Sequence, residues 1–171
     1  QGIGSAATRH NYGLLVAIAD TEERMLEQME LFREKRVDGI IASYALAQLE
    51  KLEKNGIPIV LASSESTKKN LPFVVTDNFE GGKIAAEHLI SLGHKKILYA
   101  FAPTGKDNSR YDRFQGAKSA VKSHNLPEIL TVSSKEEFLQ IFTGKDRPTA
   151  AVCYSDYEAV MVQAAAKKAG L

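Results

Sequence analysis

The side chains best suited to metal binding are not spaced as metal sites require. None of the four histidines belongs to a His-Glu-x-x-His or Cys-His pattern, the spacings typical of zinc sites. They are His10, His88, His94 and His124. Glu87 and His88 could form an acid–base pair, but adjacent residues on a helix point in different directions. The histidines therefore indicate helix surfaces and helix ends, and we expect neither a metal nor a cofactor.

Nucleophilic and phosphate-binding patterns also lack essential parts. The sequence contains no Gly-x-Ser-x-Gly elbow and no glycine-rich loop ending in Lys-Ser/Thr. Gly81-Gly82-Lys83 lacks the first glycine of such a loop and follows the Asp77-Asn78 helix cap, so close helix packing or a nearby ligand explains it better. Cys153 lies in an apolar run and indicates a small buried side chain. We expect a binding protein and not an enzyme.

Several polar residues instead lie where predicted strands end. These are Asp20, Ser43, Ser63, Thr76, Asp77 and Ser155. In a parallel α/β sheet, ligands bind at the carboxyl ends of the strands. Hydroxyl groups at strand ends are also common in turns, and Asp77 suits a helix cap whether or not it meets a ligand. The convergence of these residues on one site is the reason to consider them together.

Short apolar strands alternate along the chain with amphipathic helices, which predicts parallel sheets covered on both faces. Strands are expected at residues 14–19, 40–43, 57–61, 73–76, 96–101, 129–132 and 149–153. Helices are expected at 1–11, 22–32, 46–54, 78–92, 109–121, 135–142 and 156–169. A new strand–helix series starts at Asp77, so we place a boundary between a first part, 1–76, and a second part, 77–171.

Composition is that of an ordinary globular protein and excludes several classes. The 22 basic and 21 acidic residues are interspersed and give a formal net charge of +1, so this chain alone should bind DNA poorly. The single cysteine cannot form an internal disulfide and suits a reducing cytoplasm. No apolar run approaches the roughly 20 residues of a membrane helix, and no secretory leader is visible.

Long stretches of the sequence resemble the LacI/GalR family of bacterial transcription regulators. The most specific is the segment 75–97, in which Val-Thr-Asp-Asn opens a helix that closes with His-Leu-Ile-Ser-Leu-Gly-His. Arg-Val-Asp-Gly-Ile-Ile at 36–41, Ser109 to Gly116, and Pro148 to Ala159 are similar to further family segments in order and spacing. Together these stretches cover nearly the whole chain.

The resemblance implies a fold of the periplasmic-binding-protein-like type I, with two Rossmann-like lobes whose parallel sheets are flanked by helices. It implies a cytoplasmic homodimer that binds a small-molecule effector, a sugar or a derivative, in the cleft, and operator DNA through an N-terminal helix-turn-helix domain. By comparison with the family we expect the chain to be truncated at both ends. The helix-turn-helix domain and the first strand of the core are absent, the second lobe is incomplete, and the segment between Leu126 and Lys135 is short.

The same resemblance singles out residues for effector binding. Arg113 matches the family's effector-contacting arginine, and its guanidinium offers five donors in a fixed fork. By itself it would be interpreted as a solvated helix residue, as most arginines are, but the matching Ser109-to-Gly116 frame favours binding. Ser155 replaces the usual asparagine and is followed by Asp156, which could cap the last helix or bind the effector. Ser109 completes this set.

Two other functions remain open from the sequence. A periplasmic sugar-binding protein of a transporter shares the implied fold, although the phrase from His88 to Lys96 favours the regulator. An α/β enzyme would need a catalytic constellation that these residues do not supply. If the ligand is a sugar, its face could stack on Tyr44, Phe79 or Tyr154, although core packing explains Phe79 equally well.

Overall fold

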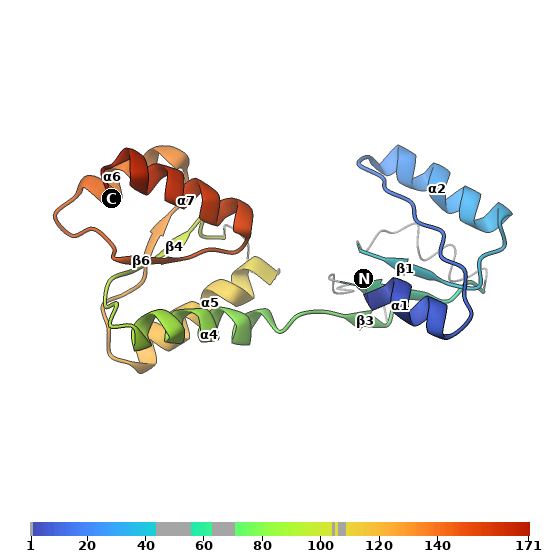
Figure 1. Ribbon diagram of the computed structural model, residues 1–171, viewed down its shortest axis with the longest axis horizontal. Coiled ribbons are helices and arrows are strands. Elements are labelled where there is room, and N and C mark those ends of the chain that lie inside the picture. The colour runs from blue at the N-terminus through green and yellow to red at the C-terminus, as the bar shows by residue number, and fades with distance from the viewer. Residues whose placement is uncertain (1, 44–55, 63–70, 104, 106–108) are drawn as a thin grey trace. The chain divides into compact units, whose positions relative to one another are not determined.

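The computed structural model describes residues 2–43, 56–62, 71–103, 105 and 109–171, and it divides into two compact units. The first unit is Gln1–Val75 and the second is Thr76–Leu171, so the division falls one residue before the predicted boundary. The helix expected at 46–54 lies outside the described residues. Each unit has its own parallel sheet, as the fold class requires (Figure 1).

The first unit is built on three short parallel strands in the order β1-β2-β3. They are β1 (Ile40–Ala42), β2 (Ile59–Ala62) and β3 (Phe73–Val74). Helix α1 spans Gly2–Arg9, and helix α2 spans Glu22–Glu34, where the Thr21 side chain accepts a hydrogen bond from the Arg24 amide. Thr21 is thereby the N-cap of α2.

One face of this sheet packs against α2. Ile40, Ile59 and Leu61 are buried with Met29 of the helix, and Met25 and Phe32 pack beside them. Residues 25, 29 and 32 recur at helical spacing, so one stripe of α2 supplies the whole contact. The apolar periodicity of 22–32 therefore predicted both the helix and its buried face.

The strand expected at 14–19 is wrong. This segment pairs with no described strand, and its apolar side chains are exposed, up to 91% for Ile18. A β-strand exists only through hydrogen bonds to a neighbouring strand, and an apolar run cannot form it alone. The segment is apolar, as a buried strand requires, but no described strand pairs with it.

The second unit has the strand order β5-β4-β6, all parallel. The strands are β4 (Ile97–Ala100), β5 (Leu130–Val132) and β6 (Ala150–Val152). The helices are α4 (Asn78–Ser91), α5 (Ser109–Ser123), α6 (Lys135–Thr143) and α7 (Asp156–Lys168). All four lie where the sequence predicted helices.

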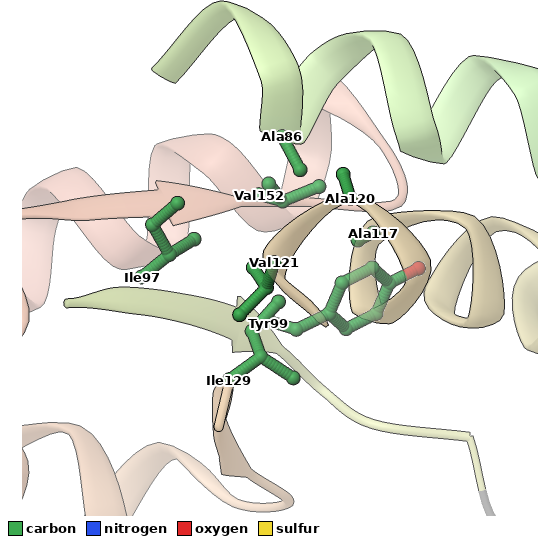
Figure 2. Close-up of a cluster of buried hydrophobic side chains, with 8 residues drawn as sticks. All are labelled: Ala86, Ile97, Tyr99, Ala117, Ala120, Val121, Ile129 and Val152. Carbon is green, nitrogen blue, oxygen red and sulfur yellow. The ribbon is translucent and has the colours of Figure 1, made fainter. Parts of the chain in front are cut away.

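Both faces of the central strand β4 are covered, and all four of its residues are buried. Ile97 and Tyr99 face helices α4 and α5, where they meet Ala86, Ala117 and Ala120 (Figure 2). Leu98 and Ala100 face α6 and α7 on the other side of the sheet. Alternate residues of a strand point to opposite faces, so a fully apolar strand is the expected signature of a sheet buried on both sides.

Helices α4 and α5 approach each other closely because of their glycines. A Cβ atom added to Gly116 would lie 1.9 Å from the carbonyl oxygen of Phe79. Only glycine fits such a backbone contact. The tight pairing fixes the beginnings of both helices, where the candidate site lies. Among the described residues, no helix is both long enough and apolar enough to span a membrane.

Candidate functional site

The candidate site is centred on Arg113, in the second turn of α5. Its Nη2 donates to Oδ1 of Asn78 at 2.7 Å, at the start of α4. Its Nη1 donates to the carbonyl oxygen of Tyr154, just before α7. Arg113 therefore joins the beginnings of three helices that are far apart in the sequence. Both acceptors are uncharged.

The side chain of Tyr154 contacts several residues of the site. Its hydroxyl lies 2.8 Å from Oγ of Ser109, the first residue of α5. The guanidinium carbons of Arg110 and Arg113 lie 4.4 and 4.8 Å from the centre of its ring, within the range of cation–π attraction. The sequence suggested Tyr154 only as a residue that could stack on a ligand; the structure makes it the common neighbour of Ser109 and Arg113.

Arg110 and Glu158 form an ion pair in contact with Tyr154, and the carboxylate of this pair is buried. Glu158 is 4% exposed and accepts from Nη1 of Arg110 through Oε1 and from the backbone amide of Tyr154, at 3.0 Å, through Oε2. Arg110 also donates to the carbonyl oxygen of Phe101, at 3.3 Å. A carboxylate is buried at acceptable cost only when it is paired and hydrogen-bonded, as here.

Ser155 and Asp156 follow Tyr154 directly, and the structure separates their structural roles. Ser155 is the N-cap of α7, and its Oγ accepts from the amide of Glu158 at 3.5 Å. Asp156 is the first helical residue and is exposed, so the cap considered for it belongs to Ser155. Its carboxylate lies at the positive end of the helix dipole.

Thr76 and Asp77 reach the same region through α4. Asp77 is the N-cap of this helix and accepts from the amide of Glu80 at 2.9 Å. The carbonyl oxygen of Thr76 accepts from Nδ2 of Asn78 at 3.0 Å. Asn78 therefore bonds Arg113 through its oxygen and Thr76 through its nitrogen, which sets the orientation of its amide.

The remaining predicted residues belong to the first unit. Ser43 is exposed and directly follows β1, at the carboxyl end of that strand. Ser63 lies outside the described residues. Within the second unit the structure thus brings together Ser109, Arg113, Ser155, Asp156, Thr76 and Asp77.

A pocket of about 420 Å³ adjoins this network. Arg110, Tyr154, Ser155 and Glu158 line it on the polar side. Its remaining walls are apolar or aromatic, formed by Phe101, Ala102, Pro103, Tyr157 and Met161. A concave surface with a few convergent polar groups is the usual form of a small-molecule site.

Burial near the site raises the pKa values of two acidic groups. Desolvation, with the nearby negative charge of Glu158 as a smaller cause, raises the pKa of the Tyr99 hydroxyl from 10.0 to about 12. The same two causes raise the pKa of the Cys153 thiol from 9.0 to about 11. A thiol with that pKa is a poor nucleophile at neutral pH. The apolar reading of Cys153 agrees with this environment.

The site residues that sequence reasoning did not select are Asn78, Arg110 and Glu158. One signal was present: Ser155 and Glu158 form a Ser-x-x-Glu capping box, which places Glu158 close to the chain before the helix. Nothing in the local sequence pairs Glu158 with Arg110, 48 residues away. No group of three potential metal ligands occurs among the described residues.

The arrangement offers both donors and acceptors at the ends of parallel strands. Arg113 supplies N–H donors, and its buried Nε has no hydrogen-bond partner among the described residues. Asp156 and the hydroxyl of Ser155 supply acceptors. Such a set suits an uncharged polar molecule with several hydroxyl groups, because each hydroxyl can both donate and accept. The fold and the site are those expected of an α/β small-molecule-binding protein.

Comparison with known proteins places the chain more closely. All residues, 1–171, match the family described as periplasmic binding proteins and the sugar-binding domain of the LacI family, and the chain belongs to that family. The resemblance seen in the sequence is thereby confirmed.

Its relatives include transcription regulators. The chain is 27% identical to the transcriptional repressor PurR of Actinobacillus pleuropneumoniae, over 95% of this chain and 52% of that protein. A LacI-family regulatory protein of Chloroflexus aggregans superimposes with a TM-score of 0.78 at 25% identity, over 98% of this chain and 64% of that one. A LacI-family regulator of Enterococcus faecium with bound ribose gives 0.72 at 26% identity, over 99% and 65%. The chain spans about half the length of the curated relatives it matches.

Proposed function

We propose that this chain is the ligand-sensing part of a LacI-type transcription regulator and that it binds a sugar or sugar derivative. The observation that carries the proposal is the position of Arg113, whose guanidinium joins the starts of α4 and α5 and the segment before α7. A ligand that contacts Arg113 therefore acts on three helices at once. Such a residue can report ligand binding to the rest of the unit.

The chemistry of the site supports a polyhydroxylated effector. The buried Nε of Arg113 donates to no acceptor among the described residues, and an unsatisfied buried donor costs about 1–3 kcal/mol. A ligand oxygen that reaches Nε would relieve that cost. Asp156 is exposed and directly follows Ser155 in the chain. Its carboxylate would accept a hydrogen bond from a ligand hydroxyl. Ser109, Thr76 and Asp77 are further proposed contacts from the second unit, and Ser43 and Ser63 remain predicted contacts from the first unit.

In this proposal the protein acts in the cytoplasm as a homodimer, without catalysis. Operator DNA is bound through a helix-turn-helix domain that lies outside this chain. Effector binding regulates only if the effector prefers one conformation of the sensor, and a difference of about 1–3 kcal/mol gives a 5- to 150-fold change in operator affinity. The net charge of +1 agrees with a sensor that does not itself hold DNA.

A thermal-shift and calorimetric screen tests the proposal. The probes are D-ribose, D-glucose, D-ribose 5-phosphate and hypoxanthine, each with the wild-type protein, Arg113→Ala and Arg147→Ala. Arg147 is an exposed arginine of the same unit and serves as the control. A ligand at 100 times its dissociation constant should stabilise the native state by about 2.7 kcal/mol.

We expect one sugar to stabilise the wild type and Arg147→Ala but not Arg113→Ala. Stabilisation by hypoxanthine alone would contradict the sugar class while leaving the site in place. A sugar that binds Arg113→Ala as well as wild type would contradict the site. The regulator is favoured if the full-length protein binds operator DNA and the sugar changes that affinity. The periplasmic sugar-binding alternative is favoured if the full-length protein binds no operator DNA.

A further inference from the structure

Two helices of the second unit begin with the same Ser-x-x-Glu motif but use its glutamate differently. In α6, Ser134 is the N-cap and Glu137 accepts from the Ser133 amide at 2.8 Å. In α7, Ser155 is the N-cap and Glu158 accepts from the Tyr154 amide at 3.0 Å. Capping the helix is therefore common to both glutamates.

The difference lies in burial and in a second partner. Glu137 is exposed, as capping glutamates generally are. The side chain of Glu158 is only 6% exposed and is paired with Arg110, whose own side chain is 33% exposed. Capping alone does not require a buried carboxylate, and burying one costs desolvation energy that an exposed glutamate avoids. The Arg110–Glu158 pair therefore has a role beyond starting the helix.

The contacts of the pair show what it holds in place. Arg110 bonds the carbonyl oxygen of Phe101, at the end of β4, and covers the ring of Tyr154. Phe101 has a φ of 53°, a left-handed conformation that a non-glycine residue adopts only when its surroundings impose it. Glu158 fixes the amide of the same Tyr154. The ion pair thus joins the loops after β4 and β6.

Tyr154 passes this constraint to Arg113. The tyrosine amide is bound by Glu158, while its carbonyl oxygen is bound by Arg113. The orientation of the carbonyl depends on the same backbone that the amide anchors. The guanidinium of Arg113 keeps a fixed orientation only while Tyr154 stays in place.

We propose that the Arg110–Glu158 ion pair is a positioning element that fixes Tyr154, and through it Arg113, and so sets which effectors the site accepts. The part of this inference that concerns effectors rests on the proposed function. The part that concerns the orientation of Arg113 does not. Neither Arg110 nor Glu158 needs to contact the effector for the proposal to hold.

The test compares Glu158→Gln with the matched control Glu137→Gln. Glutamine keeps an oxygen that can cap, but it removes the charge that pairs with Arg110. The first measurement needs no effector: NMR of the arginine side chains reports whether the guanidinium N–H groups of Arg113 are held or rotate freely. We expect separate Arg113 signals in wild type and Glu137→Gln, and averaged signals in Glu158→Gln.

The second measurement is the order of affinities for D-ribose, D-glucose and D-ribose 5-phosphate. We expect at least a tenfold loss for the preferred sugar in Glu158→Gln and a reduced difference among the three. Loss of fold stability alone would lower the melting temperature without changing that order. Arg110→Gln, which alters a partly exposed side chain, is the second variant and should give the same pattern, and the double variant should lose no more than either single one.

The outcomes separate this inference from the proposed function. Unchanged Arg113 signals in a folded Glu158→Gln or Arg110→Gln protein would overturn the positioning role, even if a sugar binds. Averaged signals together with no sugar binding to wild type would support the positioning of Arg113 and overturn the sugar class. If Glu158→Gln does not fold, the signals of Arg110→Gln decide.

Discussion

Gly82 of α4 lies directly against the backbone of Arg113 in α5. A Cβ atom added to Gly82 would come within 1.8 Å of the Arg113 carbonyl oxygen, far closer than any real contact. Gly81, its neighbour, has nothing within 4 Å of the same position. The pair Gly81-Gly82 therefore has one packing glycine and one free one, and the packing glycine sets where the candidate binding arginine sits.

This relationship makes Gly82→Ala destabilising. The added methyl group forces the two helices apart, and overpacking of this kind costs about 1–3 kcal/mol or more. Gly81→Ala should be neutral or stabilising by up to about 1 kcal/mol, because alanine is the better helix former. Urea denaturation of the two variants measures the difference. Equal stabilities would contradict the close approach of α4 and α5.

Arg113→Lys should weaken binding of the preferred sugar at least tenfold while the protein stays folded. Lysine keeps the charge but is a point donor, and it cannot reach the Asn78 oxygen and the Tyr154 carbonyl with the fixed geometry of a fork. Isothermal titration calorimetry measures the loss. Arg147→Lys is the control and should bind as wild type does; retained affinity in Arg113→Lys would mean that charge alone suffices.

Ser155→Ala and Asp156→Asn should separate capping from binding. Removing the N-cap hydroxyl of α7 should cost about 1 kcal/mol of stability. Asp156→Asn removes only a dipole interaction, worth about 0.3–1 kcal/mol, but it also removes the charged acceptor proposed for the effector. Denaturation should therefore show the larger loss of stability in Ser155→Ala. Calorimetry should show the larger loss of affinity in Asp156→Asn. Full affinity in Asp156→Asn would remove that residue from the site.

Cys153 should react slowly with iodoacetamide at pH 8 and faster as the pH approaches about 11, the pKa of its thiol. Burial is the larger cause of this shift and the charge of Glu158 the smaller. Glu158→Gln should therefore move the reactivity profile to lower pH, whereas Glu137→Gln should not. Mass spectrometry of the alkylated protein follows the reaction. A wild-type profile centred near pH 9 would contradict the buried environment.

Stability should decrease above about pH 9. The pKa values of Cys153 and Tyr99 rise on folding, from 9.0 to about 11 and from 10.0 to about 12. The unfolded chain therefore loses these protons first, so the contribution of both groups is complete below pH 9 and is lost as the pH rises to 12. Urea midpoints between pH 8 and 11 measure the slope. The double variant Cys153→Ala, Tyr99→Phe should show a shallower one.

The sequence by itself determined most of the secondary structure of this protein. Apolar runs and helical spacing located β4, α4 and α7, and the Asp-Asn signal located the start of α4, because these effects act within a few residues. The family resemblance, carried by the segment 75–97, added the fold and pointed to Ser109 and Arg113. Features that depend only on residues close together in the sequence could therefore be predicted from it.

Only the tertiary structure decided which residues meet. Whether 14–19 forms a strand depended on a partner, and the described residues supply none. The partners of Arg113 lie 35 and 41 residues away, and Glu158 meets Arg110 across 48. Capping motifs at 134–137 and 155–158 look alike in sequence, yet one glutamate is exposed and the other buried. Burial and long-range pairing depend on how the helices pack on the sheet, and no local pattern encodes that.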